Sequence, residues 1–332
     1  MLIPTFVLEN PSFMPASPVI RRVRSGDARG FTLLELMIAM AILAVIMTLF
    51  TIMFTGTSKA WLNGEGHAER RRNVRAIADF IGTELQGALL PVAQSTGGAP
   101  ANLQFIINPP VDRLSADYRN ADCIFWQAPL ARETSFGEIA QVGYFVKWEN
   151  AVPMLCRFFV NPSVKIDGVL KPNPQFLIYQ DANPDLWVSS SVVDEVVKPA
   201  DVDAGYKGLF AEYVLGLWIR SFGLDGVELP REYDSRVGYN CQFPTTGGGT
   251  VTEQRRLPAT VQVSLAQIDS RYASRLAVVA DDMRELSRET NTRDAAQFLN
   301  RLETASANRE DLKRLLPGIR IYTTQVQLQN AR

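Results

Sequence analysis

Residues 29–54 read RGFTLLELMIAMAILAVIMTLFTIMF, and the interpretation of the whole chain starts from this stretch. From Phe31 to Phe54 it has roughly 24 residues and one charge, Glu35, so it is long enough to cross a bilayer as a helix. A carboxylate in such a run costs on the order of 2–3 kcal/mol at mid-bilayer and less near the interface, so it is expected to have a partner. The stretch therefore predicts a transmembrane helix over 31–54 with a functional carboxylate near its start.

Basic residues precede the apolar run and favour keeping its N-terminal side in the cytoplasm. They are Arg21, Arg22, Arg24 and Arg29. A cleaved secretory signal would have a shorter apolar region, followed promptly by a small-x-small cleavage site that is not found here. A plain membrane anchor is the remaining alternative, but it leaves Glu35 without a role. The pattern favours an anchored chain whose larger part is exported.

The string RGFTLLE at residues 29–35 resembles the cleavage and methylation signal of type IV pilins and type II secretion pseudopilins. The resemblance implies a leader peptide over 1–30, cleavage after Gly30 by a membrane-embedded prepilin peptidase, and N-methylation of Phe31. It also implies that Glu35 is the assembly carboxylate, which would pair with the positive amino terminus of a neighbouring subunit. The leader is longer than is usual in that family.

Residues 55–91 predict an amphipathic second half of the same helix. Its apolar stripe recurs at three- and four-residue steps and consists of Val74, Ile77, Phe80, Ile81, Leu85 and Leu89. Gly64 and Gly66 each cost up to about 1 kcal/mol relative to Ala, so we expect a kink or a locally melted turn near 63–66. Pro91 predicts the end of the helix, and the stripe is expected to pack on a globular head.

Residues 100–332 change to short β-like runs bounded by Gly, Pro, Asn and Asp, which predicts a β-rich head. The runs at 259–268 and 319–329 alternate apolar and polar residues, as half-buried strands do. Between them, at about 275–315, apolar positions in a charged background predict a helical insert. The predicted fold class is α+β, with a long N-terminal helix, transmembrane in its first half, packed on an antiparallel sheet.

Two weaker similarities concern the head. LFAEYVLGLWIRSFGLDG at 209–226, followed by LPATVQVSL at 257–265, resembles the paired signature of the larger, J-type minor pseudopilins. QAPL at 127–130, VSLAQIDSRYASRL at 263–276 and IYTTQVQL at 321–328 are similar to the Verru_Chthon cassette protein C family. The first similarity implies a minor, initiating or tip-like subunit of a pilus or pseudopilus, whereas the second family has no assigned biochemistry. Other pilin-like subunits, a platform protein and an ATPase would do the work of assembly.

Composition and motifs argue against an enzyme. The 34 basic and 35 acidic residues leave a net charge of -1, which gives no overall attraction to nucleic acid. The one histidine, His67, and three widely spaced cysteines do not match the ligand spacing of a zinc site. No GxGxxG, CxxC, HExxH or P-loop motif is present. We expect a structural protein without a metal or cofactor, in the inner membrane with its head in the periplasm or on the cell surface.

The three cysteines suggest one disulfide and one free thiol if the head is exported. The sequence does not choose among the three pairings, although Cys123 and Cys156 both lie in strand-like runs and form the preferred pair. The alternative is that all three, Cys241 included, are small buried hydrophobic residues.

A basic cluster after the apolar run raises DNA binding as a candidate function. It consists of Arg70, Arg71, Arg72 and Arg75. Aromatic residues do not interleave it, which favours a basic helix face near anionic lipid headgroups instead. A second alternative for the whole chain is a bitopic envelope protein that is processed but never polymerises, with an adhesive or ligand-binding head.

Overall fold

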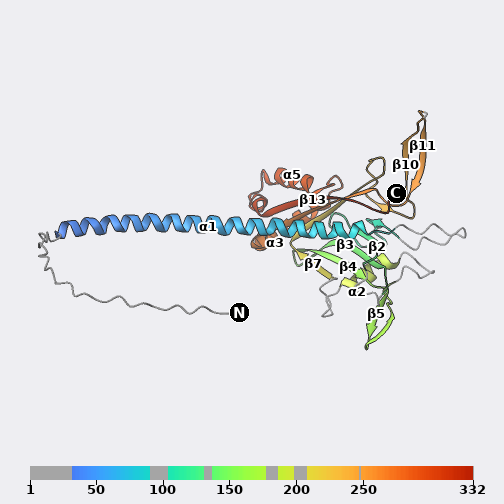
Figure 1. Ribbon diagram of the computed structural model, residues 1–332, viewed down its shortest axis with the longest axis horizontal. Coiled ribbons are helices and arrows are strands. Elements are labelled where there is room, and N and C mark those ends of the chain that lie inside the picture. The colour runs from blue at the N-terminus through green and yellow to red at the C-terminus, as the bar shows by residue number, and fades with distance from the viewer. Residues whose placement is uncertain are drawn as a thin grey trace, which may run out of the picture. The chain divides into compact units, whose positions relative to one another are not determined.

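The computed structural model describes residues 32–89, 104–130, 137–176, 186–197, 208–246 and 248–331. The chain divides into two compact units, Met1–Asn63 and Gly64–Arg332. One long helix, antiparallel sheets and several shorter helices make up the molecule (Figure 1). The predicted α+β class is confirmed.

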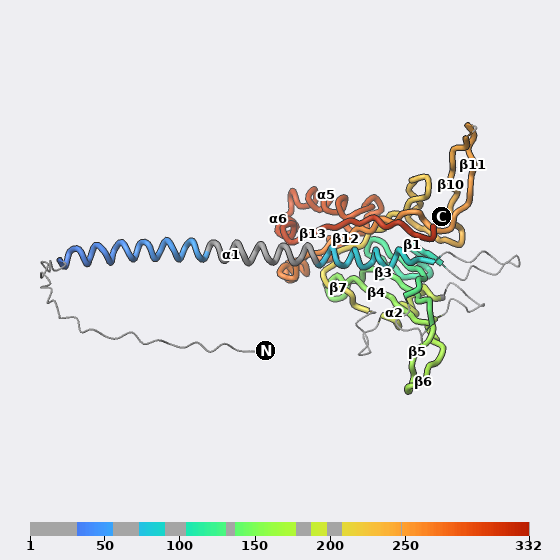
Figure 2. The backbone as a smooth tube through the Cα atoms, in the orientation of Figure 1, coloured from blue at the N-terminus to red at the C-terminus, as the bar shows by residue number. Residues whose placement is uncertain are grey.

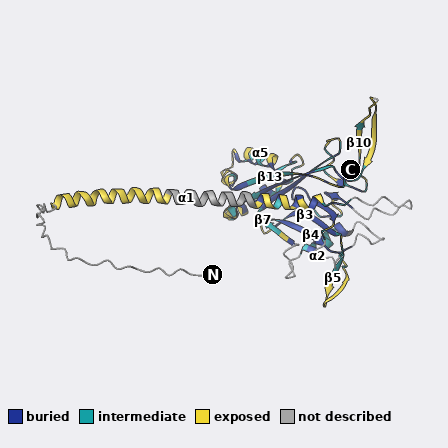
Figure 3. Ribbon diagram, viewed as in Figure 1, coloured by how far each residue is buried: buried dark blue, intermediate teal, exposed yellow. Residues whose placement is uncertain are grey.

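Helix α1 spans Leu33–Gln86 and is the first element among the described residues (Figure 2). Within the first unit, Leu33–Thr55 has a mean hydropathy of 2.7 and is exposed along its whole length (Figure 3). By length and composition this part of α1 could cross a membrane. The backbone stays helical through Gly64 and Gly66, so the locally melted turn predicted near 63–66 is absent, and the kink stays a prediction. Extending a formed helix is easy compared with starting one, and two glycines do not outweigh that cooperativity.

A six-stranded antiparallel sheet in the order β7-β4-β3-β2-β1-β9 forms the larger layer of the second unit. Its strands are β1 (Ile106–Ile107), β2 (Ile124–Ala128), β3 (Ala140–Glu149), β4 (Val152–Val160), β7 (Gly208–Glu212) and β9 (Tyr233–Asp234). The two-residue turn between β3 and β4 has positive φ at both Asn150 and Ala151, as the twist of a tight hairpin favours.

A second sheet has three antiparallel strands in the order β13-β12-β8. They are β8 (Val214–Phe222), β12 (Thr260–Ile268) and β13 (Ile319–Gln327), so both strands predicted at the end of the chain are present. Two hairpins stand out from the second unit in Figure 1. They are formed by β5 (Ser163–Ile166) with β6 (Val169–Pro172), and by β10 (Tyr239–Pro244) with β11 (Thr250–Arg255).

Short helices cover the sheets. Between β12 and β13 the chain forms α3 (Ala273–Val278), α4 (Ala280–Arg288), α5 (Ala295–Ser306) and α6 (Glu310–Lys313), in the region where the sequence predicts a helical insert. Helix α5 lies against the three-stranded sheet, where the rings of Phe298 and Trp218 are 5.2 Å apart. Helix α2 (Ser190–Val197) packs on β4 of the larger sheet.

Two hydrophobic clusters lie on opposite faces of the six-stranded sheet. The larger contains Ile124, Trp126 and the buried stripe of α1, and the smaller contains Phe125 and the apolar side of α2. Because side chains alternate along a strand, neighbouring residues of β2 enter different clusters. Gly143 leaves room for the ring of Phe125, because a Cβ at this position would lie 2.2 Å from Cδ1 of Phe125.

The stripe predicted on α1 is largely buried. Val74, Ile81 and Leu85 are almost inaccessible, whereas Phe80 is 43% exposed. The pattern follows the 3.6-residue period, so one side of this part of α1 faces the core and the other faces solvent.

The predicted disulfide between Cys123 and Cys156 is absent, because the cysteines are free and buried. Cys156 pairs with Phe145 on β3, and Cys123 precedes Ile124, whose partner on β3 is Tyr144. Strand β3 therefore separates the two cysteines. Two strand spacings place their Cα atoms about 10 Å apart. A disulfide requires about 4.4–6.8 Å. Burial raises the pKa of both thiols to about 12.

Candidate functional site

The start of α1 is a reciprocal cap built by Thr32 and Glu35. The backbone N–H and the hydroxyl of Thr32 each donate to Oε2 of Glu35 at 3.0 Å, and the N–H of Glu35 donates to the Thr32 hydroxyl at 3.2 Å. This is the capping box of a helix that begins at Leu33, and it satisfies donors that would otherwise lack partners. The Thr-x-x-Glu spacing is the sequence signal for it. Glu35 therefore has a partner within its own chain, while Gly30 and Phe31 lie outside the described residues.

The threonine side chains in the apolar part of α1 find hydrogen-bond acceptors within the same helix. The hydroxyls of Thr48, Thr51 and Thr55 donate to the carbonyl oxygens of Ala44, Met47 and Thr51, each at 2.8 Å. In a bilayer every polar group must find a partner within the protein, and these bonds meet that requirement. Its 23 residues rise about 35 Å, enough for a hydrocarbon core of about 30 Å.

The predicted basic cluster is described at one position. Arg75 donates to Asp79 one turn later, with Nε and Oδ2 3.3 Å apart, and both side chains are largely exposed. The backbone of Arg70, Arg71 and Arg72 is helical, but their side chains fall outside the described part of the structure. At Arg75 the geometry is that of an ordinary i,i+4 surface pair.

A buried polar cluster attaches the second part of α1 to the six-stranded sheet. The side chains of Glu84 and Arg157 are 7% and 6% exposed, and Nη2 of Arg157 donates to Oε1 of Glu84. The Tyr144 hydroxyl donates to Oε2 of Glu84 at 2.5 Å and accepts from Nε of Arg157 at 3.1 Å. Burial and the nearby Glu84 carboxylate raise the pKa of Tyr144 well above its ordinary value. Removing either charge would leave the other buried without its opposite charge, so the cluster penalises any other register of α1 on the sheet.

The sequence carries a sign of this cluster that pattern reasoning missed. Glu84 lies between Ile81 and Leu85 on the buried stripe, where a charged residue is unexpected. Its partner Arg157 is 73 residues away along the chain and comes from β4, where Tyr144 of β3 lies directly opposite. Spacing alone does not reveal such a pair.

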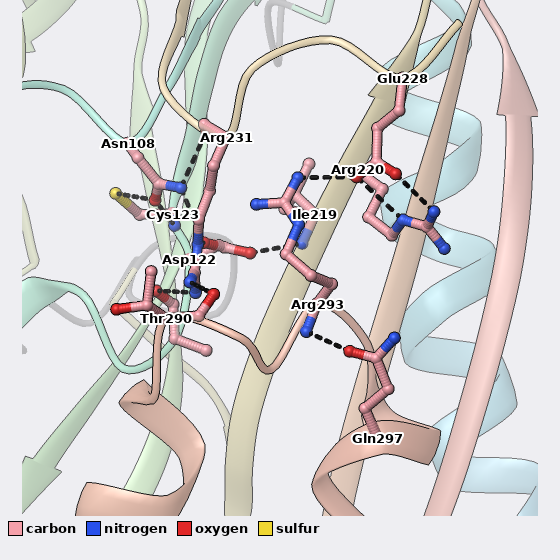
Figure 4. Close-up of polar contacts among 11 residues, drawn as sticks. Asn108, Asp122, Cys123, Ile219, Arg220, Glu228, Arg231, Thr290, Arg293 and Gln297 are labelled. Atoms are coloured by element: carbon pink, nitrogen blue, oxygen red, sulfur yellow. Dashed lines mark hydrogen bonds and ion pairs between the residues drawn. The ribbon is translucent and has the colours of Figure 1, made fainter. Parts of the chain in front are cut away.

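A second polar junction is centred on Asp122, just before β2 (Figure 4). Its side chain is 1% exposed, and its Oδ1 accepts from Nδ2 of Asn108 and Nε of Arg231, both at 2.7 Å. Oδ2 accepts from the backbone N–H of Ile219 on β8 at 2.9 Å, and Nη1 of Arg231 donates to the carbonyl of Thr290 at 3.0 Å. The junction ties the six-stranded sheet to β8 and to the helical insert.

A third group lies beside it at the surface (Figure 4). Glu228 accepts from Nη2 of Arg220 at 2.5 Å and from Nη2 of Arg293 at 2.7 Å. These hydrogen bonds, from Arg220 first, lower the pKa of Glu228 from 4.5 to about 2. The group joins β8 to the start of α5, so its role in the structure is to hold the insert in place.

Within the described ranges, no three His, Cys, Asp or Glu side chains are grouped so that they could hold a metal ion. The polar groups described above form hydrogen bonds and ion pairs with one another. Their arrangement is that of structural junctions, and it does not present a nucleophile or a general base to a cleft.

Comparisons with known proteins bear on the N-terminal segment. Residues 26–51 match the family model described as the prokaryotic N-terminal methylation motif, which confirms the predicted prepilin-type signal. A type IV-like pilin from Thermus thermophilus is a structural match with 9% sequence identity and a TM-score of 0.32, covering 79% of this chain and 99% of that chain. A TM-score that low does not establish a common fold. No curated protein matches the chain significantly.

Proposed function

From the N-terminal methylation motif at residues 26–51, we propose that the chain is a minor pilin-like or pseudopilin-like structural subunit. In this proposal a prepilin peptidase cuts after Gly30 and methylates the new amino terminus at Phe31. The apolar part of α1 holds the subunit in the inner membrane until assembly, with the leader in the cytoplasm and the second unit in the periplasm or on the cell surface. Other pilin-like subunits, a platform protein and an ATPase are the expected partners.

The observation that carries the proposal is the motif in its structural context. The matched residues include Glu35 and run into a predominantly apolar helical span of 23 residues, every one of them exposed. An exposed apolar surface of that size needs either lipid or the helices of other subunits around it. A subunit that moves from membrane to filament uses the same surface in both places.

The large second unit supports a minor position rather than that of the abundant subunit. It spans Gly64–Arg332 and adds a helical insert and two hairpins to its sheets. Such bulk fits poorly in a closely packed helical array but can be accommodated at an end of the filament. The junctions within it hold parts together and suggest no chemistry, which agrees with a structural role.

The cap at the start of α1 favours one alternative, a processed membrane protein that does not polymerise. Glu35 already accepts two hydrogen bonds from Thr32, so it does not need a neighbouring subunit to be satisfied. In this alternative the second unit would adhere to a surface or bind a ligand. The two functions make different demands on the charge of Glu35.

Mass spectrometry of the N-terminus of protein purified from membranes tests the proposal directly. A chain that begins with N-methylated Phe31 is the expected result. A chain that begins at Met1 or Met14, in cells with an active prepilin peptidase, would contradict it and leave the apolar helix as an ordinary anchor.

Two substitutions at Glu35 separate assembly from anchoring. Gln at this position retains the capping hydrogen bonds but removes the charge, whereas Ala removes both. If the charge serves assembly, Glu35→Gln and Glu35→Ala are both cleaved normally, and both fail to enter filaments. If Glu35 serves only as a cap, Glu35→Gln behaves as the wild type.

A further inference from the structure

A cleft lies at one end of the three-stranded sheet, beside a row of residues that crosses all three strands. Phe222 of β8, Thr260 of β12 and Gln327 of β13 are paired directly across the strands, so their side chains share one face. Gln325 is the next residue of β13 on the same face. All four residues line the cleft, whose volume is about 410 Å³. That volume lies within the range of ligand sites, about 300–1,000 Å³.

The helical insert covers the same face of the sheet but stops short of this end. Trp218 of β8 packs against Phe298 of α5, with the ring centroids 5.2 Å apart. Two residues further along β8, Nη1 of Arg220 lies 3.8 Å from Oδ2 of Asp294, the N-cap residue of α5. Phe222 follows on this face, and no described residue of the insert lines the cleft beside it. The last row of the sheet face is therefore left open to a ligand.

Backbone hydrogen bonds hold the segments that line the cleft. In the turn after β8, the N–H of Gly223 donates to the carbonyl of Val227 at 2.8 Å, and the N–H of Gly226 donates to the carbonyl of Gly223 at 3.0 Å. Elsewhere in the lining, the N–H of Leu328 donates to the carbonyl of Ala259 at 3.0 Å. A cleft whose backbone is already fixed costs less conformational entropy when a ligand binds.

The lining of the cleft is neutral, partly polar and partly apolar. Every described residue that lines it is uncharged. Apolar surface comes from residues that include Phe222 and Leu224, both half-buried. The polar side chains are one hydroxyl and two carboxamides, from Thr260, Gln325 and Gln327. Within the described part of the chain these three side chains have no hydrogen-bond partner, so their donors and acceptors are available to a ligand.

Two charged residues close to the cleft in sequence are engaged with other groups. Cζ of Arg220 lies 5.3 Å from the ring centroid of Phe222, and its Nη2 donates to Oε2 of Glu228 at 2.5 Å. Oδ1 of Asp225 accepts from the N–H of Val227 at 3.1 Å. Neither Arg220 nor Asp225 lines the cleft. An ionic ligand would therefore lose its hydration there without gaining an opposite charge.

We propose that this cleft binds an uncharged carbohydrate. The carboxamides of Gln325 and Gln327 each donate and accept hydrogen bonds, which matches the hydroxyl groups of a sugar, since each of those also donates and accepts. The ring of Phe222 and the side chain of Leu224 match the apolar C–H face of a sugar ring. The inference goes beyond the proposed function, because the cleft depends on neither N-terminal processing nor assembly.

Other classes of ligand match the lining less well. A hydrocarbon would leave the hydroxyl and the two carboxamides without water and without partners, which costs free energy. A calcium or magnesium ion would find no carboxylate among the described lining residues. An extended peptide is bound chiefly through backbone groups at the edge of a sheet, whereas the polar groups here are side chains on its face.

The test uses the full-length chain in a detergent with a zwitterionic headgroup, because a sugar headgroup would compete for the cleft. The chain is applied to an array of neutral, sialylated and sulfated oligosaccharides, and the neutral glycan that is retained best is titrated by calorimetry. Gln325→Leu and Gln327→Leu each remove one carboxamide at similar side-chain size. Gln242→Leu on β10 is the matched control, because Gln242 is also an exposed glutamine in a strand. Urea denaturation of each variant checks that the second unit remains folded.

The expected result is retention of neutral glycans. Gln325→Leu and Gln327→Leu should each raise the Kd by about fivefold or more through lost hydrogen bonds, while Gln242→Leu leaves it unchanged. Retention of no neutral glycan, retention of sialylated or sulfated glycans alone, or a Kd insensitive to both cleft variants would overturn the inference. In a parallel array of uncharged peptides, retention of peptides in place of glycans would assign the cleft to a protein partner and also overturn it. Mass spectrometry of the N-terminus of the same preparation reports processing separately.

Discussion

The two ends of α1 belong to one helix but differ in composition and in burial. Leu33–Thr55 is predominantly apolar and is exposed along its whole length. Near the other end, Val74, Ile81 and Leu85 are buried on one side, while Asp79 and Thr83 on the other side are exposed. The first part requires only an apolar environment, and many sequences would satisfy it. The second part requires particular partners, because it holds a buried charge pair and approaches two sheets closely.

This difference predicts which property of the protein a substitution in each part should change. Changes in the first part should affect insertion and assembly but leave the free energy of unfolding of the second unit unchanged. Changes on the buried side of the second part should have the opposite effect. Pairs of matched substitutions in α1 test whether the two parts differ in this way.

The largest effect is expected from Glu84→Ala, which leaves Arg157 buried without its charge partner. The free energy of unfolding of the full-length chain in detergent should fall by about 3–5 kcal/mol, measured by urea denaturation. The control is Arg75→Ala, which removes the exposed pair with Asp79 and should cost below about 0.5 kcal/mol. Equal losses for the two variants would show that the buried cluster is not what attaches α1.

Leu85→Ala should follow, because this side chain is fully buried in the larger cluster. Truncating a buried leucine costs about 2–5 kcal/mol, depending on how far the cavity collapses. Leu43→Ala, in the exposed part of α1, should leave the same urea midpoint unchanged. A shift of the midpoint by Leu43→Ala would contradict the separation of the two parts.

Thr32→Val should loosen only the start of the helix, by about 1 kcal/mol for a lost cap. Hydrogen exchange of the amides at 33–35 in detergent micelles should speed up about fivefold, while amides near Leu85 keep their protection. Thr48→Val is the control, since it removes a hydroxyl that bonds to a carbonyl within an already complete turn. If Thr48→Val accelerated exchange at 33–35 equally, the cap would not be the cause.

The smallest effect is expected for Glu228, whose charge is only partly buried, in contrast to Glu84. Its pKa is lowered from 4.5 to about 2 in the folded chain, so its stabilising contribution is complete above pH 4.5 and is lost as pH falls toward 2. Solvent screening limits the contribution to about 1 kcal/mol or less. Glu228→Gln should flatten the fall of the unfolding free energy between these pH values, and an unchanged slope would assign that fall to other carboxylates.

Much of the fold could be predicted because its signals are local. The apolar run of α1, the stripe from Val74 to Leu85 and the alternation in β12 are each read from short windows. The prepilin-type motif could also be predicted, because all of its residues lie together at 29–35. The signal that was overlooked, the Thr32–Glu35 cap, was also local.

The junctions could not be predicted, because their members are far apart in the sequence. Asp122 and Arg231 are separated by 109 positions, and neither has a distinctive neighbour. The predicted disulfide failed for a related reason. Two cysteines in separate strand-like runs need adjacent strands in register, and the sequence does not show that β3 lies between them. The polar junctions and the placement of the cysteines both depend on which distant segments pack together in the folded chain.

The separation of Cys123 and Cys156 by a strand has a consequence for how this protein can be made. A domain that depends on a disulfide reaches its native state only where an oxidant is present, and reducing agents destabilise it. Here the thiols are buried with a pKa of about 12, so they are almost entirely unionised and slow to react at neutral pH. Because Cys123, Cys156 and Cys241 are free in the folded structure, folding of the second unit requires no oxidation step.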